Sequence, residues 1–121
     1  MAVRNYRELV VWQKSMAAVK VLCSLVKKLP KEELFALSDQ MRRCAVSIPS
    51  NIAEGQQRNG GAEFSRFIMY AQGSRAELET QLLICVEVGY LTEDDIAELM
   101  NLLEEINEML CTLAKTLSVK E

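Results

Sequence analysis

Histidine is absent from the 121-residue sequence. It is the side chain most often used as a general base near neutral pH, and it is the commonest ligand of metal ions in proteins. An enzyme built from this chain would have to use carboxylates, lysine, tyrosine or cysteine instead. We therefore expect no catalytic residue, no cofactor and no metal site.

Cysteine is sparse, and the four cysteines fall on four different predicted helices, at Cys23, Cys44, Cys85 and Cys111. A rise of about 1.5 Å per helical residue spreads them over roughly 15 Å along a helix bundle. Sulfurs that bind one zinc ion all lie about 2.3 Å from it. The cysteines therefore do not form a four-cysteine zinc site, and we interpret them as reduced, small core residues.

Residues that break helices are also few, with two prolines and five glycines. Leucine, alanine, glutamate and lysine dominate, and all four favour helix. Half of the residues are hydrophobic, which is too many for a disordered chain. Length and composition predict one all-α domain over residues 1–121.

No apolar run approaches the length of about 20 residues that crosses a bilayer. Residues 1–8 lack the apolar core of a signal peptide. We expect a cytoplasmic protein with no membrane partner.

Apolar residues recur at steps of three and four, which predicts helices over residues 6–29, 32–57 and 62–88. A fourth helix begins at Thr92, a capping hydroxyl followed by acids in the first turn, and its last periodic residue is Leu117. Long helices joined by short connections predict an up-down-up-down antiparallel four-helix bundle. Asn59-Gly60-Gly61 marks a turn between the second and third helices, and Gly89 caps the third.

Pro49 lies in the middle of the second predicted helix, where proline costs about 3 kcal/mol. Its position predicts a kink in that helix. Gly73-Ser74 predicts a close approach of a neighbouring backbone to the third helix. Small residues that would allow another such approach flank Pro49, namely Ala45, Ser47, Ser50, Ala53 and Gly55.

The fourth predicted helix has an apolar sector wider than the roughly 100° that a surface helix needs. Its seam of isoleucine and leucine residues is flanked by Met100, Leu102 and Met109. This excess predicts that the fourth helix also contacts another subunit.

Charge is distributed unevenly along the chain. Residues 1–75 hold twelve Lys/Arg and six Asp/Glu, whereas residues 76–121 hold two Lys/Arg and eleven Asp/Glu. Net charges of +6 and −9 follow, and they sum to the overall −3. The asymmetry predicts complementary surfaces, either within the fold or between subunits.

Basic residues lie on the side of the first helix opposite its apolar stripe. The ordinary interpretation is a solvated lysine face, and the alternative is a nucleic-acid contact. The candidate nucleic-acid-binding residues are Arg7, Lys14, Lys20, Lys27, Lys28, Lys31, Arg42 and Arg58.

A polar stripe on the second helix, joined by Glu77 on the third, has mixed charge. We interpret it as a hydrogen-bonded seam to another helix or subunit, because buried polar groups need partners. A small helical enzyme that holds an acid with Arg43, Glu54, Glu77 and Gln81 is the remote alternative. The residues of this polar seam are Gln40, Arg43, Ser47, Asn51, Glu54 and Glu77.

The segment from Arg42 to Gly55, RRCAVSIPSNIAEG, resembles the signature of the bacterial four-helix-bundle family of 23S rRNA intervening-sequence proteins. Phe67 followed by residues 71–82, AQGSRAELETQL, resembles the second signature of that family, and residues 9–14, LVVWQK, fit its N-terminal pattern. The resemblance covers nearly the whole chain. The family is in turn similar to the accessory variability protein of diversity-generating retroelements, a basic pentamer that binds nucleic acid and a reverse transcriptase.

This resemblance implies a homopentameric ring of four-helix bundles, with RNA or a nucleic-acid-processing protein as a partner. The chain differs from its retroelement relative in being acidic overall. We therefore expect a non-enzymatic, ring-forming scaffold or accessory protein associated with RNA or ribosomes. A purely structural adapter oligomer without nucleic-acid binding is the alternative.

Overall fold

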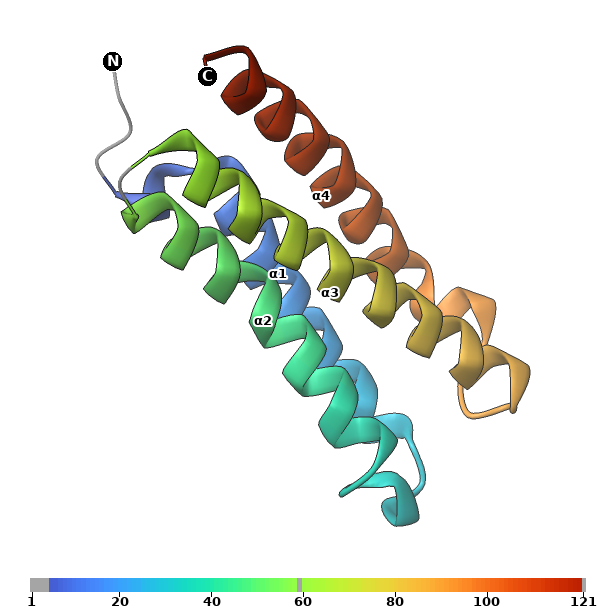
Figure 1. Cartoon of the computed structure of the whole chain (residues 1–121). Coiled ribbons are helices and arrows are strands. Elements are labelled where there is room, and N and C mark those ends of the chain that lie inside the picture. Colours follow the sequence, from blue (N-terminus) through green and yellow to red (C-terminus); the bar gives the residue numbers. More distant parts are fainter. Residues whose placement is uncertain (1–4, 59, 121) are drawn as a thin grey trace.

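The computed structural model describes residues 5–58 and 60–120. Four α-helices make up most of it: α1 (Val10–Leu25), α2 (Leu37–Gln57), α3 (Gly61–Glu87) and α4 (Glu93–Lys120) (Figure 1). Three short 3-10 turns, η1 (Tyr6–Glu8), η2 (Val26–Lys28) and η3 (Lys31–Glu33), flank α1 and precede α2. The predicted all-α class with four helices is confirmed, and no strand occurs in the described ranges.

Each helix packs against the next one in the chain, and α1 also packs against α4. Contacts between neighbours pair residues in reversed order. Lys14 meets Glu105 whereas Lys28 meets Asp95, so α1 and α4 run in opposite directions. Figure 1 shows the same reversal at each of the three connections.

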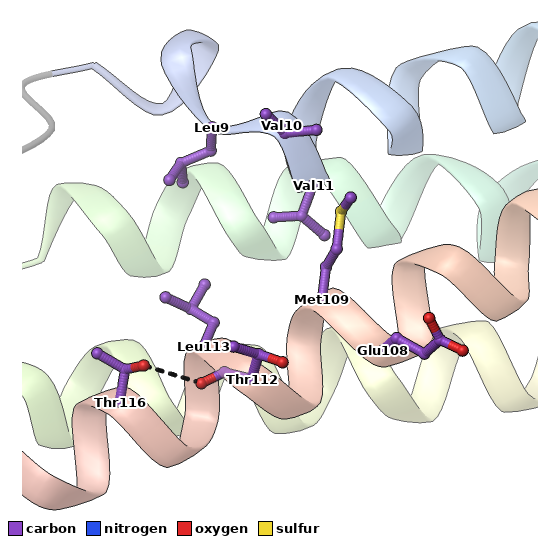
Figure 2. A pocket seen from close by; sticks show the side chains of 8 residues that line it. All are labelled: Leu9, Val10, Val11, Glu108, Met109, Thr112, Leu113 and Thr116. Carbon is purple, nitrogen blue, oxygen red and sulfur yellow. Dashed lines mark hydrogen bonds between the residues drawn. The ribbon is translucent and has the colours of Figure 1, made fainter.

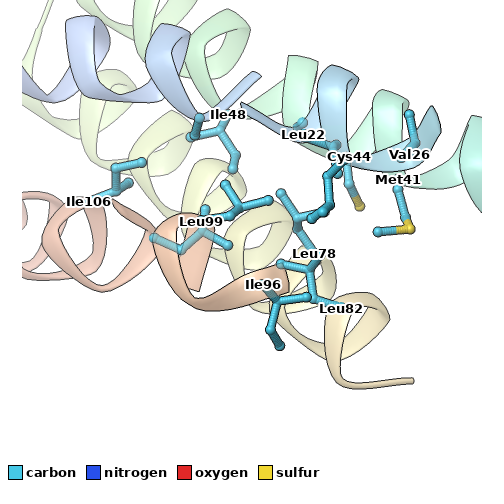
Figure 3. Packing of buried hydrophobic residues seen from close by; sticks show 14 of the residues in the cluster. Leu22, Val26, Met41, Cys44, Ile48, Leu78, Leu82, Ile96, Leu99 and Ile106 are labelled. Atoms are coloured by element: carbon cyan, nitrogen blue, oxygen red, sulfur yellow. The ribbon is translucent and has the colours of Figure 1, made fainter. Parts of the chain in front are cut away.

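The core lies between the four helices and receives side chains from all of them (Figure 3). Leu22, Ile48, Leu78 and Leu99 are each completely buried. Burying one such side chain contributes about 1.5–3 kcal/mol. The predicted apolar stripes therefore form one hydrophobic core.

Local signals fix both sides of the α3–α4 connection. The Asp95 amide donates to the Thr92 hydroxyl, at 3.0 Å, and the Thr92 amide donates to the Asp95 carboxylate, at 2.9 Å. This reciprocal pair is a capping box, and it confirms Thr92 as the start signal of α4. Gly89 has a φ of +86°, as expected for the residue that follows a capped helix.

The prediction that the second helix begins near residue 32 is wrong. Residues 31–33 form η3, and α2 begins only at Leu37, because Ala36 has non-helical backbone angles of φ −121° and ψ −102°. Leu34, an apolar residue within the predicted helix, is 45% exposed and precedes α2. Ser38, a polar residue of the same predicted helix, is buried.

The close approach predicted at Gly73 is also wrong, since a Cβ added there would meet nothing within 4 Å. The approach occurs at Gly55, where an added Cβ would lie 2.6 Å from the Cβ of Phe67 on α3. Pro49 is buried inside the helical range of α2, and the kink there stays a prediction. Gly60 has a φ of +108°, in agreement with the predicted turn, whereas Asn59 lies outside the described residues.

Candidate nucleic-acid interface

Three of the eight candidate nucleic-acid-binding residues form ion pairs within the chain. Lys14 contacts Glu105 at 2.6 Å, Lys28 contacts Asp95 at 2.9 Å, and Arg58 contacts Glu54 at 2.7 Å. Two of these pairs reach acidic α4, one from Lys14 of α1 and one from Lys28 of η2. Some of the basic residues of the N-terminal part therefore pair with acidic residues of the C-terminal part within one chain.

Lys28 pairs with a carboxylate that also caps α4. Its hydrogen bond, together with bonds from Thr92, lowers the pKa of Asp95 from 3.8 to about 2. Asp95 also forms the α4 capping box, so the lysine is tied to a carboxylate with a structural role of its own. Lys28 is thus a poor candidate for a phosphate contact.

Lys20 and Arg7 lie at different places in the fold. Lys20 lines a groove between α1 and α4 that also contains Lys28, Asp95 and Glu98. The Arg7 guanidinium lies over the Tyr6 ring, 5.7 Å from its centroid. The predicted basic residues do not form one continuous face.

Lys27, Lys31 and Arg42, by contrast, line one cavity of about 220 Å³ where α1 turns into α2. We call these three residues the basic corner. No acidic residue lines the cavity, and within residues 5–58 and 60–120 none of the three cations forms an ion pair. Its other lining residues are Val26, Leu29, Pro30, Leu34 and Ser38.

The basic corner follows from how the chain turns there. Leu29 and Pro30 have extended backbone, with ψ of 153° and 148°, which ends η2 and directs the chain into η3. Val26, Leu29 and Ser38 are buried and fix the floor of the turn. The two lysines and Arg42, which come from three separate elements, are thereby held around the same space.

An exposed aromatic side chain lies next to this corner in the chain. Phe35 is 91% exposed and directly follows Leu34, a lining residue of the cavity. Phe35 was not among the predicted site residues, because residues 32–57 were expected to form one helix, whereas α2 begins at Leu37. The one sequence signal for an exposed ring was that Leu34-Phe35 directly follows the charged residues 31–33.

Four residues of the polar seam line a second cavity, of about 250 Å³, between α2 and α3: Gln40, Arg43, Ser47 and Glu77. The Ser47 and Ser74 hydroxyls hydrogen-bond across the two helices there. Asn51 instead donates to the Ser47 carbonyl of its own helix, at 2.8 Å. The seam is a helix-to-helix contact over part of its predicted length.

Each of the four residues of the enzyme hypothesis contacts a side chain on its own helix or at the cap of that helix. Arg43 pairs with Asp39 at 3.1 Å, and Glu54 pairs with Arg58. The Gln81 amide donates to Glu77 at 3.3 Å. Arg43 and Glu77 both line the cavity between α2 and α3, whereas Glu54 and Gln81 are not among its lining residues.

The nearby thiol of Cys44 is not activated. Burial, reinforced by a hydrogen bond with Glu77, raises its pKa to about 12, so it is protonated at neutral pH. Burial also raises the pKa of Cys85.

Cys111, which we interpreted as a core residue, is exposed, and that interpretation is wrong. The described residues contain no cluster of cysteines and acids suited to a metal ion.

An apolar groove of about 490 Å³ lies between the start of α1 and the C-terminal half of α4 (Figure 2). Leu9 and Val11 face Met109 and Leu113 across it. Glu108 is its one charged lining residue, and the Thr116 hydroxyl donates to the Thr112 carbonyl. The groove offers hydrophobic contact and no set of groups for chemistry.

Large exposed hydrophobic side chains are concentrated on α3 rather than on α4. Met69, Tyr70, Leu83 and Ile84 are between 44% and 69% exposed, and we call these four residues the α3 outer face. Among the described side chains of α4, none of the large hydrophobic ones is exposed to this degree. Met100, Leu102 and Met109 of α4 are half-buried against the core, and the contact of the fourth helix with another subunit stays a prediction.

None of the described helices combines the length and the apolar character needed to cross a membrane. The sequence model of a family described as 23S rRNA-intervening sequence protein matches residues 7–112. No curated protein matches the chain. The matched range contains both signature segments and the whole basic corner.

Proposed function

Since the chain belongs to the 23S rRNA-intervening sequence protein family, we propose that it is a non-enzymatic, self-associating bundle that binds RNA through the basic corner. The observation that carries this proposal is the convergence of Lys27, Lys31 and Arg42 on one cavity free of acids. Phosphate groups are the ligands that such a group of cations favours, because binding releases the counterions of the nucleic acid.

The net charge of −3 does not argue against a local contact. Most acids of the C-terminal third lie on α4, and two of them, Asp95 and Glu105, pair with Lys28 and Lys14. Attraction between exposed charges falls off over a Debye length of about 8–10 Å at physiological salt. A phosphate in the cavity therefore meets chiefly the charges close to it, which are the three cations that line the cavity and the neighbouring acids Glu32 and Glu33.

Self-association is supported by the apolar surface that one chain leaves uncovered. The α3 outer face and the groove between α1 and α4 are different surfaces of the same protomer. Contacts between two different surfaces are heterologous, and such contacts close into rings when the rotation allows it. This arrangement fits the homopentamer implied by the family resemblance.

The absence of catalysis is part of the same proposal. It is supported by the local engagement of Arg43, Glu54 and Gln81 and by the protonated state of Cys44. All four cysteines are free thiols, which suits a reducing compartment, and we place the protein in the cytoplasm.

A second candidate function is that of a protein adapter that binds no RNA. The α3 outer face favours it, because exposed hydrophobic side chains of this kind mark protein contacts. The two candidates differ in what the basic corner does. An adapter would keep its assembly state and its partner when the corner loses its charge.

A filter-binding titration with a structured RNA separates these functions. The wild-type protein is expected to bind at about 50 mM salt and to lose most of this affinity at about 200 mM. Lys27→Glu combined with Lys31→Glu should abolish binding, whereas Lys14→Glu, which breaks an intramolecular pair, should preserve it. If the wild-type protein binds no RNA at the lower salt, RNA binding is refuted and the adapter function is the remaining candidate.

A further inference from the structure

Phe35 differs from every other aromatic residue of the chain. Trp12 and Tyr6 contact each other with ring centroids 5.3 Å apart, and Phe67 and Tyr70 do so at 5.4 Å. Phe64 packs against the core, and the Tyr90 hydroxyl donates to Glu33 at 2.7 Å. Phe35 alone is almost fully exposed, at 91%.

The ring of Phe35 is attached next to the basic corner. Its neighbour Leu34 lines the cavity with Lys31, and successive Cα atoms are about 3.8 Å apart. Of the two acids in the same turn, Glu33 is engaged with Tyr90 and with the Leu37 amide. Glu32 is exposed and is the one acid of this turn without such a contact in the described part of the chain.

We infer that the basic corner binds unpaired nucleotides of an RNA, with one base stacked on Phe35 and the adjoining phosphates on Lys27, Lys31 and Arg42. This inference rests on the proposed function and narrows its ligand to single strands. Stacking of a base on an exposed aromatic ring, beside cations that follow the backbone, is how many proteins hold single-stranded nucleic acid.

A double helix fits this corner less well. Its bases are stacked on one another, so their faces are not available to a protein ring. Proteins that recognise duplex RNA by shape span about 16 base pairs. The corner offers three cations around 220 Å³, which suits one or a few nucleotides.

The test uses the full-length protein and a fluorescein-labelled single strand of about eight nucleotides, with the corresponding duplex as competitor. Phe35→Ala should weaken binding of the single strand by roughly 5- to 150-fold, the range covered by loss of one stacked base. Phe35→Leu should weaken it similarly, because leucine is apolar but has no π face. Phe35→Trp should preserve or strengthen it.

Met16→Ala is the matched control, since Met16 is 45% exposed and lies in the middle of α1, about 16 Å along the helix from Lys27 and outside the cavity lining. It should bind like the wild type. Circular dichroism and solution mass should be unchanged in every variant, because Phe35 makes no core contact.

Each other outcome overturns a defined part of the account. Wild-type binding of RNA that Phe35→Ala and Phe35→Leu leave unaffected would refute the stacking role and leave the proposed function intact. Equal affinity of the wild type for duplex and for single-stranded RNA would refute the inferred preference for unpaired nucleotides. A fall in solution mass in Phe35→Ala would make the ring a contact between copies. Failure of the wild type to bind any RNA would refute the proposed function itself.

Discussion

Removing single charges from the basic corner should reduce the salt dependence of RNA binding in equal steps. The logarithm of the affinity for a single strand falls with the logarithm of salt, with a slope of about −0.7 per neutralised phosphate. Three contacts therefore give a slope of about −2.1. Raising salt from about 50 to 200 mM should then weaken binding about 18-fold.

Lys27→Gln, Lys31→Gln or Arg42→Gln should each lower the slope to about −1.4, so that the same change in salt weakens binding only about 7-fold. Lys28→Gln is the matched control, because it lies beside Lys27 in the chain but pairs with Asp95. Its slope should remain at about −2.1, whatever the small loss of stability that follows from breaking an exposed ion pair.

Fluorescence anisotropy with a strand of about eight nucleotides measures these slopes, since such a strand is too short to bridge distant sites of an oligomer. If all eight basic residues bound phosphates, the wild-type slope would be about −5.6. A slope of that size, or equal effects of Lys27→Gln and Lys28→Gln, would refute the assignment of the contact to the corner.

Further predictions concern stability and assembly. Gly73→Ala should raise the free energy of unfolding by about 1 kcal/mol and the melting temperature by about 4 °C, since its site is open. Gly55→Ala should lower the free energy of unfolding by about 2 kcal/mol, because an added Cβ meets Phe67; equal effects of the two variants in urea unfolding would contradict the packing. The lowered pKa of Asp95 contributes stability above its ordinary value of 3.8 that is lost as pH falls toward 2. Asp95→Asn should therefore lose less stability than the wild type between about pH 5 and pH 2.5, and parallel urea midpoints would be evidence against this. Leu83→Glu should lower the solution mass in sedimentation without changing helicity, and an unchanged mass would exclude the α3 outer face from assembly.

The sequence was most informative where local patterns decide the structure. Thr92 followed by three acids specified the start of α4, and the alternation from Ile96 to Leu110 specified a buried helix face. These signals act within one or two turns of helix. They do not depend on how the helices are placed relative to one another.

The candidate site was harder to predict because it depends on tertiary placement. Lys27 and Lys28 are adjacent in the sequence, yet one lines the cavity and the other pairs with Asp95, 67 residues away in the chain. Ala36 interrupts the helical pattern through its backbone angles alone, and this exposes Phe35. No periodicity distinguishes Gly55 from Gly73, because only the position of α3 makes one crowded and the other open.

The most direct test of RNA binding at the α1–α2 turn is photocrosslinking of the wild-type protein to a single strand that carries 4-thiouridine, followed by peptide mapping. The account predicts adducts on peptides from residues 27–42, with Phe35 among the modified residues. Adducts confined to α3 or α4, or none when the strand is in excess, would contradict it.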